Sequence, residues 1–248
     1  MTIKDFKNSV QKQQWQTAIS LIRINSSLSR KKYSIPSFVS EVDADASEVY
    51  PIHHVCSKVD APVELIEFLS STFPEGIYKT ESSMQRTCLH IAILNSLPDN
   101  VISYLIDLNP MAVQVQDKYG RVPLHYACSK IRSFESIQKI IRPFPQCIKA
   151  PDWKKWTPLH VAVTKNNDPN IIEYMLSLYP ETLSMITSSG STLLDAVINA
   201  QEFCNKQTIM NIIIGKKAEF DELPESQNLR NSTIRPLTPL TMQPYSIV

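Results

Sequence analysis

Residues 157–162 read Thr157-Pro-Leu-His-Val-Ala162, and this hexapeptide recurs in register along the chain. Variants stand at residues 87–92 (TCLHIA), 122–127 (VPLHYA) and 192–197 (TLLDAV), and with the copy at 157 the four begin at residues 87, 122, 157 and 192, which are 35 apart each time. An earlier copy at 50–55 (YPIHHV) begins 37 residues before Thr87. A fixed period of this length indicates an architecture of stacked structural repeats.

The period continues outside the hexapeptide. A proline recurs at Pro74, Pro110, Pro145 and Pro180, and an apolar residue follows each of them three positions later. Before each proline, apolar residues are spaced three and four apart, which predicts one buried face of a helix. The hexapeptide predicts the start of a shorter helix, because the proline at its second position is tolerated in a first helical turn. Each unit is therefore expected to hold a short helix, a loop, a second helix that ends before the proline, and an extended segment leading to a turn.

The hexapeptides and their period resemble the ankyrin-repeat family, whose signature includes Thr-Pro-Leu-His-x-Ala. The resemblance implies an all-α solenoid of stacked helix pairs, with a concave face and inter-repeat turns that bind other proteins. We place an ankyrin-repeat domain at 50–215, between N- and C-terminal caps. Its repeats lie near 50–86, 87–121, 122–156 and 157–191, followed by a degenerate cap at 192–215.

The turns between repeats depart from the family pattern Asp-x-x-Gly-x-Thr. The turn at 117–121 keeps both Asp and Gly, and the turn at 187–191 keeps only Gly190. Gln85 and Lys155 stand where the other two turns would have glycine. We expect these turns to be looser or differently shaped.

Three segments flank the repeats. Residues 1–28 contain apolar residues at helical spacing and are expected to form an N-terminal capping helix. Residues 29–49 change from basic to acidic and are expected to be a mobile loop. Residues 216–248 contain four prolines and little apolar periodicity, and are expected to be a disordered tail. The tail ends Ser246-Ile-Val248, which resembles a C-terminal ligand of PDZ domains.

Composition excludes several functional classes. The chain holds four glycines, where average usage predicts about 17, and none has the spacing of a phosphate-binding loop. The formal net charge of +1 gives no support for binding nucleic acid or a membrane surface. The first residues lack an apolar core, so we do not expect them to form a secretory signal. Five cysteines without a Cys-x-x-Cys spacing favour a reducing cytoplasmic or nuclear location.

The residues that could carry chemistry favour structural roles. All five histidines lie in the hexapeptides, and we expect them to form hydrogen bonds that tie neighbouring turns together. Only His53 and His54 leave open an alternative as metal ligands. Cys56 and Cys128 occupy matching core positions, and no paired-carboxylate signature is present. We therefore expect no catalytic residues, no metal and no cofactor.

The turn tips carry the residues that we expect to contact a partner. These are Tyr119, Arg121, Trp153, Lys154 and Trp156, together with Tyr126 from a short helix. Aromatic residues and arginine are enriched at interface hot spots. The sharper hypothesis is an electropositive aromatic strip for an acidic protein partner. In the plainer alternative, Trp156 packs on a neighbouring turn and the lysines are only solvated. A strip that binds nucleic acid would use similar residues, but the nearly neutral net charge does not favour it.

Three functional classes follow from this reading. The favoured one is non-catalytic protein–protein interaction, as an adaptor, scaffold or regulator. The second is an enzyme or enzyme subunit with a site between the solenoid and the non-repeat segments. The third is a repeat protein with a mainly structural role.

Overall fold

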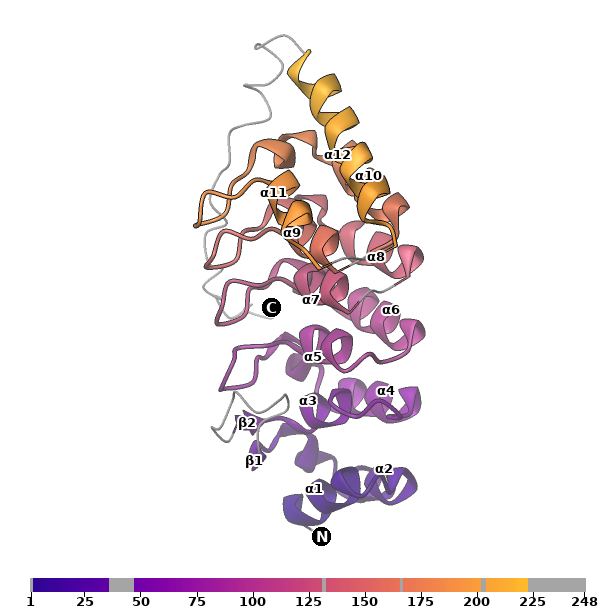
Figure 1. Cartoon of the computed structure of the whole chain (residues 1–248). Helices are drawn as coiled ribbons and strands as arrows, with labels where there is room; N and C mark the ends of the chain where they lie inside the picture. Colours follow the sequence, from indigo (N-terminus) through magenta and orange to yellow (C-terminus); the bar gives the residue numbers. More distant parts are fainter. Residues whose placement is uncertain (1, 36–46, 131–132, 166, 202–203, 223–248) are drawn as a thin grey trace, which may run out of the picture.

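The structure is a computed structural model, which describes the chain except for residues 1, 36–46, 131–132, 166, 202–203 and 223–248. Helix pairs stack on one another from the N-terminal to the C-terminal end (Figure 1). The first helices of the pairs form one layer and the second helices form another, while the turns between pairs all project to the same side (Figure 1). The expected all-α repeat solenoid is thus confirmed.

The elements follow one order in most of the repeats. The first helices are α1 (Ile3–Gln11), α3 (Pro51–Cys56), α5 (Cys88–Leu94), α7 (Pro123–Ser129), α9 (Pro158–Thr164) and α11 (Leu193–Ile198). The second helices are α2 (Trp15–Ile24), α4 (Val63–Thr72), α6 (Asp99–Leu108), α8 (Phe134–Ile141), α10 (Pro169–Leu178) and α12 (Lys206–Asp221). A 3₁₀-helix follows each of the second helices α2, α4, α6, α8 and α10: η1 (Ser26–Arg30), η2 (Pro74–Tyr78), η3 (Pro110–Gln114), η4 (Pro145–Lys149) and η5 (Pro180–Ser184).

The hexapeptide prolines begin the short helices, as predicted. Pro51, Pro123 and Pro158 are the first residues of α3, α7 and α9. The proline ring presets the helical φ angle, and its missing N–H is one that no residue of the helix would have bonded. The residue after the motif proline or its substitute is buried in four copies and joins the core from one repeat to the next (Ile52, Leu89, Leu124 and Leu159), whereas Leu194 in the last copy is partly buried.

The segment after each second helix differs from the prediction. We expected an extended chain from the proline onward, but the proline starts a five-residue 3₁₀-helix. In η3 the N–H of Ala112 donates to the carbonyl of Asn109, at 3.0 Å. This tight turn directs Val113 into the core, where it is fully buried. This turn explains why an apolar residue recurs three positions after each of these prolines.

The N-terminal segment holds two helices rather than the single expected capping helix. Thr2 caps α1, and the Asp5 side chain accepts from the Thr2 N–H at 2.7 Å. The loop to α2 uses Gln13 at φ +56°, as the loop between α5 and α6 uses Ser96 at φ +57°. The chain therefore begins with another helix pair of the repeat type, although it lacks the hexapeptide.

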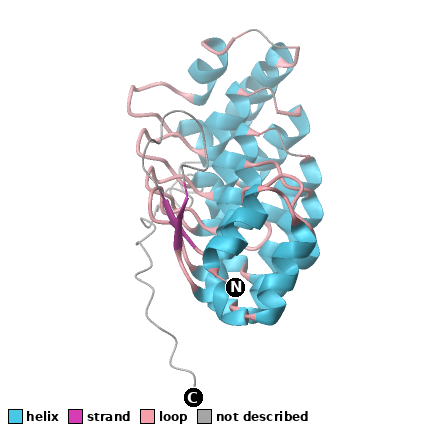
Figure 2. Cartoon of the chain, turned by 90° about the horizontal axis from the view of Figure 1, so that it is seen from below, coloured by secondary structure: helices cyan, strands magenta, loops and turns pink. Residues whose placement is uncertain are grey.

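The segment expected to be a mobile loop contains a short hairpin. β1 (Tyr33–Ile35) pairs antiparallel with β2 (Ser47–Val49), and the hairpin lies on the side of the turns (Figure 2). The Tyr33 hydroxyl lies 2.9 Å from His54 Nδ1, which fixes β1 to α3. The expectation of a mobile loop is thus wrong for both strands, and residues 36–46 lie outside the described residues.

The C-terminal cap is longer than predicted. α12 continues to Asp221, so residues 216–221 of the expected disordered tail are helical. Phe220 explains the extension, because its side chain is buried. Residues 223–248, with the PDZ-like end, lie outside the described part of the chain. Among the helices that the structure describes, none is long and apolar enough to cross a membrane.

Candidate protein-interaction surface

The turns between the helix pairs form a continuous ridge. We call residues 81–86, 117–121, 152–156 and 187–191 the turn ridge. One backbone hydrogen bond links each turn to the one before it, and the first turn to β2. The donors and acceptors are Ser82 N to Glu48 O (3.2 Å), Lys118 N to Met84 O (2.8 Å), Trp153 N to Tyr119 O (3.0 Å) and Ser188 N to Lys154 O (2.9 Å). The ridge is therefore a supported surface rather than a row of separate loops.

The motif histidines hold the ridge to the helices, as predicted. His90 Nδ1 accepts from the Thr87 N–H at 3.3 Å, so Nε2 carries the proton. His90 Nε2 then donates to the carbonyl of Arg121 in the next turn, at 3.1 Å. His125 Nε2 makes the same bond to the carbonyl of Trp156, at 3.0 Å. His160 departs from this series, because its buried Nε2 has no hydrogen-bond partner among the residues that the structure describes.

Burial keeps these imidazoles neutral. Desolvation lowers the pKa of His90 and of His160 to about 4, despite nearby Asp117 and Asp152 charges that raise them. It lowers the pKa of His53 to about 4 and that of His54 to about 3. His53 Nε2 bonds the carbonyl of Lys79 and His54 Nδ1 bonds the Tyr33 hydroxyl, so one nitrogen of each ring is engaged in a hydrogen bond. Within the described residues, no group of three or more His, Cys, Asp or Glu side chains could hold a metal ion.

Tyr119 and Trp153 form the centre of the exposed part of the ridge. Their ring centroids lie 5.7 Å apart in a T-shaped arrangement, and Trp153 is 69% exposed. Gly120 makes room for this pair, because a Cβ at that position would lie 3.1 Å from Trp153 Cδ1. Gly120 also has φ +78°, a conformation that side chains disfavour. An exposed tryptophan fixed in this way is a feature that a partner can use.

Arg121, Lys154 and Trp156 surround this pair. The Arg121 Cζ lies 5.5 Å from the Tyr119 ring centroid, and its Nε lies 3.7 Å from Asp152 Oδ2. Lys154 is exposed. Trp156 is half-buried, with its ring 5.9 Å from the His160 ring. Five of the six predicted partner-binding residues therefore belong to the turn ridge, with Trp156 partly engaged in packing.

Tyr126 does not join this exposed group. Its side chain is 8% exposed, and its hydroxyl donates to Asp117 Oδ2 at 2.5 Å. Burial and the neighbouring Asp117 raise the pKa of its phenol. Tyr126 therefore supports the turn at 117–121 from below, and we leave it out of the proposed contact surface.

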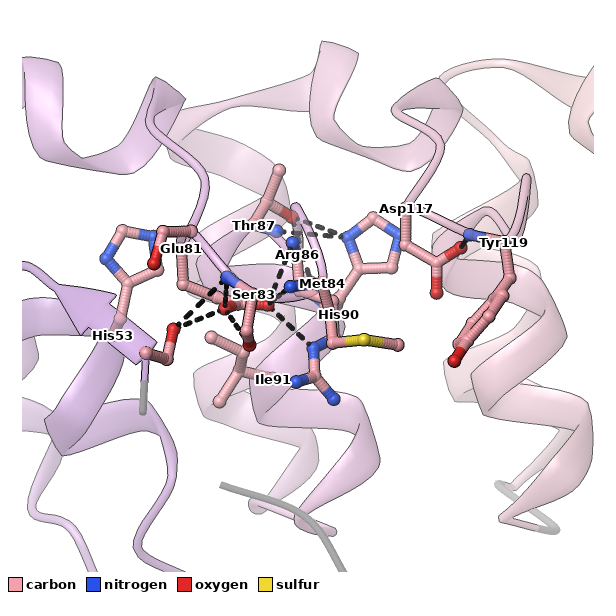
Figure 3. A network of polar contacts seen from close by, with 12 residues as sticks. His53, Glu81, Ser83, Met84, Arg86, Thr87, His90, Ile91, Asp117 and Tyr119 are labelled. Atoms are coloured by element: carbon pink, nitrogen blue, oxygen red, sulfur yellow. Dashed lines mark hydrogen bonds and ion pairs between the residues drawn. The ribbon is translucent and has the colours of Figure 1, made fainter. Parts of the chain in front are cut away.

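The turn at 81–86 contains a buried network that the sequence reading missed (Figure 3). Glu81 Oε1 accepts from Met84 N, Arg86 N and Arg86 Nε, while Oε2 accepts from Ser83 and from Ser47 of β2. Both members of the Glu81–Arg86 ion pair are buried, with exposures of 0% and 2%. The sequence does contain a sign of this different turn. Pro74 and Pro110 are 36 residues apart, whereas the later prolines are 35 apart, and the turn at 81–86 is one residue longer than the other turns. Glu81 then takes the place of the usual turn aspartate.

The surface away from the turns offers a shallow depression. It spans α2, α4 and α6 and is lined by Ile19, Arg23, Glu64, Glu67, Phe68, Ser71 and Tyr104. It contains neither histidine nor cysteine, and it does not adjoin the β1–β2 hairpin. Four of the five cysteines are buried in the core. Burial raises the pKa of Cys147 to about 12, which leaves its thiol protonated and unreactive.

Comparisons with known proteins agree with this geometry. A family model described as ankyrin repeats (3 copies) matches residues 52–149, and one described as ankyrin repeat matches residues 154–179. A yeast protein, the probable 26S proteasome regulatory subunit p28 of Saccharomyces cerevisiae, is 25% identical over 161 residues. That match covers 63% of this chain and 66% of the yeast protein, which is just under two thirds of its length.

A solved structure supports the fold. The chain is similar, with a TM-score of 0.62 and 15% identity, to a chain in the structure of the Bdellovibrio bacteriovorus predatory endopeptidase Bd0816 in complex with immunity protein Bd3460. The similarity covers 86% of this chain and 98% of that one, and at this identity it concerns the fold alone. Together with the matched repeats and the hydrogen-bonded turn ridge, these findings lead to one conclusion: the chain belongs to the ankyrin-repeat family.

Proposed function

We propose that this protein is a non-catalytic adaptor that binds a protein partner through its turn ridge. Ankyrin repeats are protein-interaction modules, and the described residues of this chain form a solenoid of such repeats. We choose this surface because of Trp153, which is 69% exposed. Its backbone N–H donates to the carbonyl of Tyr119, and its ring packs against the Tyr119 ring, so the exposed side chain is held in place. A rigid exposed aromatic side chain loses little conformational entropy on binding.

The yeast relative gives the first partner to test. Its name describes it as a probable regulatory subunit of the 26S proteasome. We propose the proteasome regulatory particle as a candidate partner of this chain, together with a cytoplasmic or nuclear location. The free cysteines fit the same location.

The experiment compares two exposed side chains. The full-length protein, immobilised as bait, is incubated with purified 26S proteasome and, separately, with extract of its native cells. Trp153→Ala is expected to reduce partner capture at least tenfold, because hot-spot tryptophans contribute about 2 kcal/mol or more. Met111→Ala is the matched control, since Met111 is 56% exposed on η3, outside the ridge.

Folding is checked for each variant by circular dichroism and thermal unfolding. Equal capture by Trp153→Ala and the unaltered protein, with both folded, would overturn the proposed surface. Capture from extract without capture of proteasome would retain the surface and reject the candidate partner.

A further inference from the structure

The carboxylates of the two central turns face inward. Asp117 Oδ1 accepts from the N–H groups of Tyr119 and Arg121, at 2.8 and 2.9 Å. Its second oxygen accepts from the Tyr126 hydroxyl, and the residue is 5% exposed. A carboxylate with these partners has little capacity left to attract a cation from outside.

Asp152 is used in the same way one repeat later. Its Oδ1 accepts from the N–H groups of Lys154 and Trp156, at 2.8 and 2.9 Å. Its Oδ2 lies 3.7 Å from Arg121 Nε, and the side chain is 9% exposed. Both acidic side chains of these turns therefore stabilise the turns themselves.

The basic side chains of the same turns face solvent. Lys118, Lys154 and Lys155 are exposed, and the Arg121 side chain is 45% exposed. Of these four, which we call the cationic patch, only Arg121 has an ion pair within the described part of the chain. The patch carries four positive charges on the same two turns that hold Tyr119 and the exposed ring of Trp153.

The neighbouring turns limit the size of the patch. At 81–86 the only charges are Glu81 and Arg86, which are buried and paired with each other. At 187–191 the sequence Thr187-Ser-Ser-Gly-Ser191 has no charge. The positive surface thus spans two adjacent turns, a width of about 10 Å between repeats.

We infer that the occupant of this patch is a short acidic segment of a protein, with carboxylates on both sides of one apolar side chain that packs on Trp153. Charge complementarity requires the segment to be negatively charged, and the two-turn width of the patch limits its length to a few residues. The exposed ring supplies the apolar contact at the centre. This inference rests on the proposed function, because it names the partner chemistry of the same surface.

Two fluorescein-labelled peptides test the inference. One has a central leucine flanked on each side by two glutamates, and the other has glutamines in place of the glutamates. Fluorescence anisotropy is measured with the full-length protein at 50 and 300 mM salt. The acidic peptide is expected to bind at least tenfold more tightly than the glutamine peptide at low salt, with the difference shrinking at high salt.

Two double variants locate the binding. K154E/K155E is expected to weaken acidic-peptide binding about tenfold or more. K12E/K139E makes the same change in net charge on α1 and α8, and is expected to leave binding unchanged. In a W15F/W156F background, the emission of Trp153 alone is expected to change when the peptide binds.

Equal affinity for the two peptides, or equal weakening by the two double variants, would overturn the inference. A single-stranded oligonucleotide that binds more tightly than the acidic peptide would also overturn it, in favour of a nucleic acid. If Trp153→Ala abolishes partner capture while the acidic peptide fails to bind, the proposed function stands and only the partner chemistry is rejected.

Discussion

Replacing Glu81 with glutamine is expected to destabilise the protein by about 3 kcal/mol at pH 7. Burial alone would raise the pKa of Glu81, but hydrogen bonds from Ser47 and Ser83 and the charge of Arg86 lower it from 4.5 to about 2. A shift of that size corresponds to about 3 kcal/mol of stability for the ionised form. Removing one partner of a buried ion pair typically has an effect of about 3–5 kcal/mol.

The pH dependence gives the prediction its direction. Because the pKa is lower in the folded state, the stabilisation is fully present above about pH 4.5, the value in the unfolded chain. It is lost as the pH falls through about 2, the value in the folded chain. The difference between the unaltered protein and Glu81→Gln should therefore shrink steadily within this window.

The assay is urea unfolding followed by circular dichroism at pH 7, 5 and 3. Glu135→Gln is the matched control, because the Glu135 side chain is 79% exposed and pairs with Lys139 on the surface of α8. That change is expected to alter the unfolding free energy by less than about 0.5 kcal/mol. A loss below 1 kcal/mol at pH 7, or an equal loss at pH 7 and pH 3, would refute the role assigned to Glu81.

Three further predictions concern the histidines and the turns. Burial lowers the pKa of His90 from 6.5 to about 4, so the neutral ring contributes stability that is present above pH 6.5 and lost as the pH falls toward 4. In His90→Gln, the urea midpoint should therefore depend less on pH between pH 6.5 and 4. An unchanged dependence would contradict this role of His90. Gly120→Ala should destabilise by about 2 kcal/mol and Gly190→Ala by about 1 kcal/mol, because both have φ +78° but only Gly120 lacks room for a Cβ; equal losses in thermal unfolding would count against the steric argument. Lys155→Gly should raise the unfolding free energy by about 0.5–1 kcal/mol, because Lys155 has φ +57°; a loss of stability would show that the turn does not strain it.

The parts of the fold that were predictable from sequence depend on side chains with one local function. A proline in a first helical turn and a threonine before a helix act on their own neighbouring backbone, so their spacing indicated where α7 and α9 begin. The missing glycines were also informative. Gln85 and Lys155 adopt the left-handed conformation of the glycines they replace, with φ +56° and +57°. The turn at 152–156 therefore keeps the geometry of the turn at 117–121, contrary to expectation, whereas the turn at 81–86 is one residue longer and differently shaped, as expected.

The parts that were missed depend on packing between distant segments. The first helix pair lacks the hexapeptide because the Thr2–Asp5 capping box replaces threonine and histidine. The strands at 33–35 and 47–49 are held by contacts with His54 and Glu81, which no local pattern reveals. Tyr126 was predicted to contact a partner, but its side chain is buried and its hydroxyl bonds Asp117, nine residues earlier in the chain, which no local pattern reveals.

The position before the first residue of each hexapeptide shows how the ridge acquires a limited cationic patch. Arg86 occupies it in the first turn and is buried, because Glu81 lies within its own turn and bonds its Nε at 3.0 Å. In the second turn Asp117 is already bonded to Tyr126 and to its own backbone, so Arg121 extends along the ridge toward Asp152. Arg121 consequently remains half exposed beside Tyr119 and Trp153. The inward orientation of the turn carboxylates thus stabilises the turns and also leaves the cations of 117–121 and 152–156 facing solvent. If the substitution of a neighbouring residue turned the Asp117 carboxylate toward solvent, we would expect the fold to lose stability and the patch to lose part of its net positive charge.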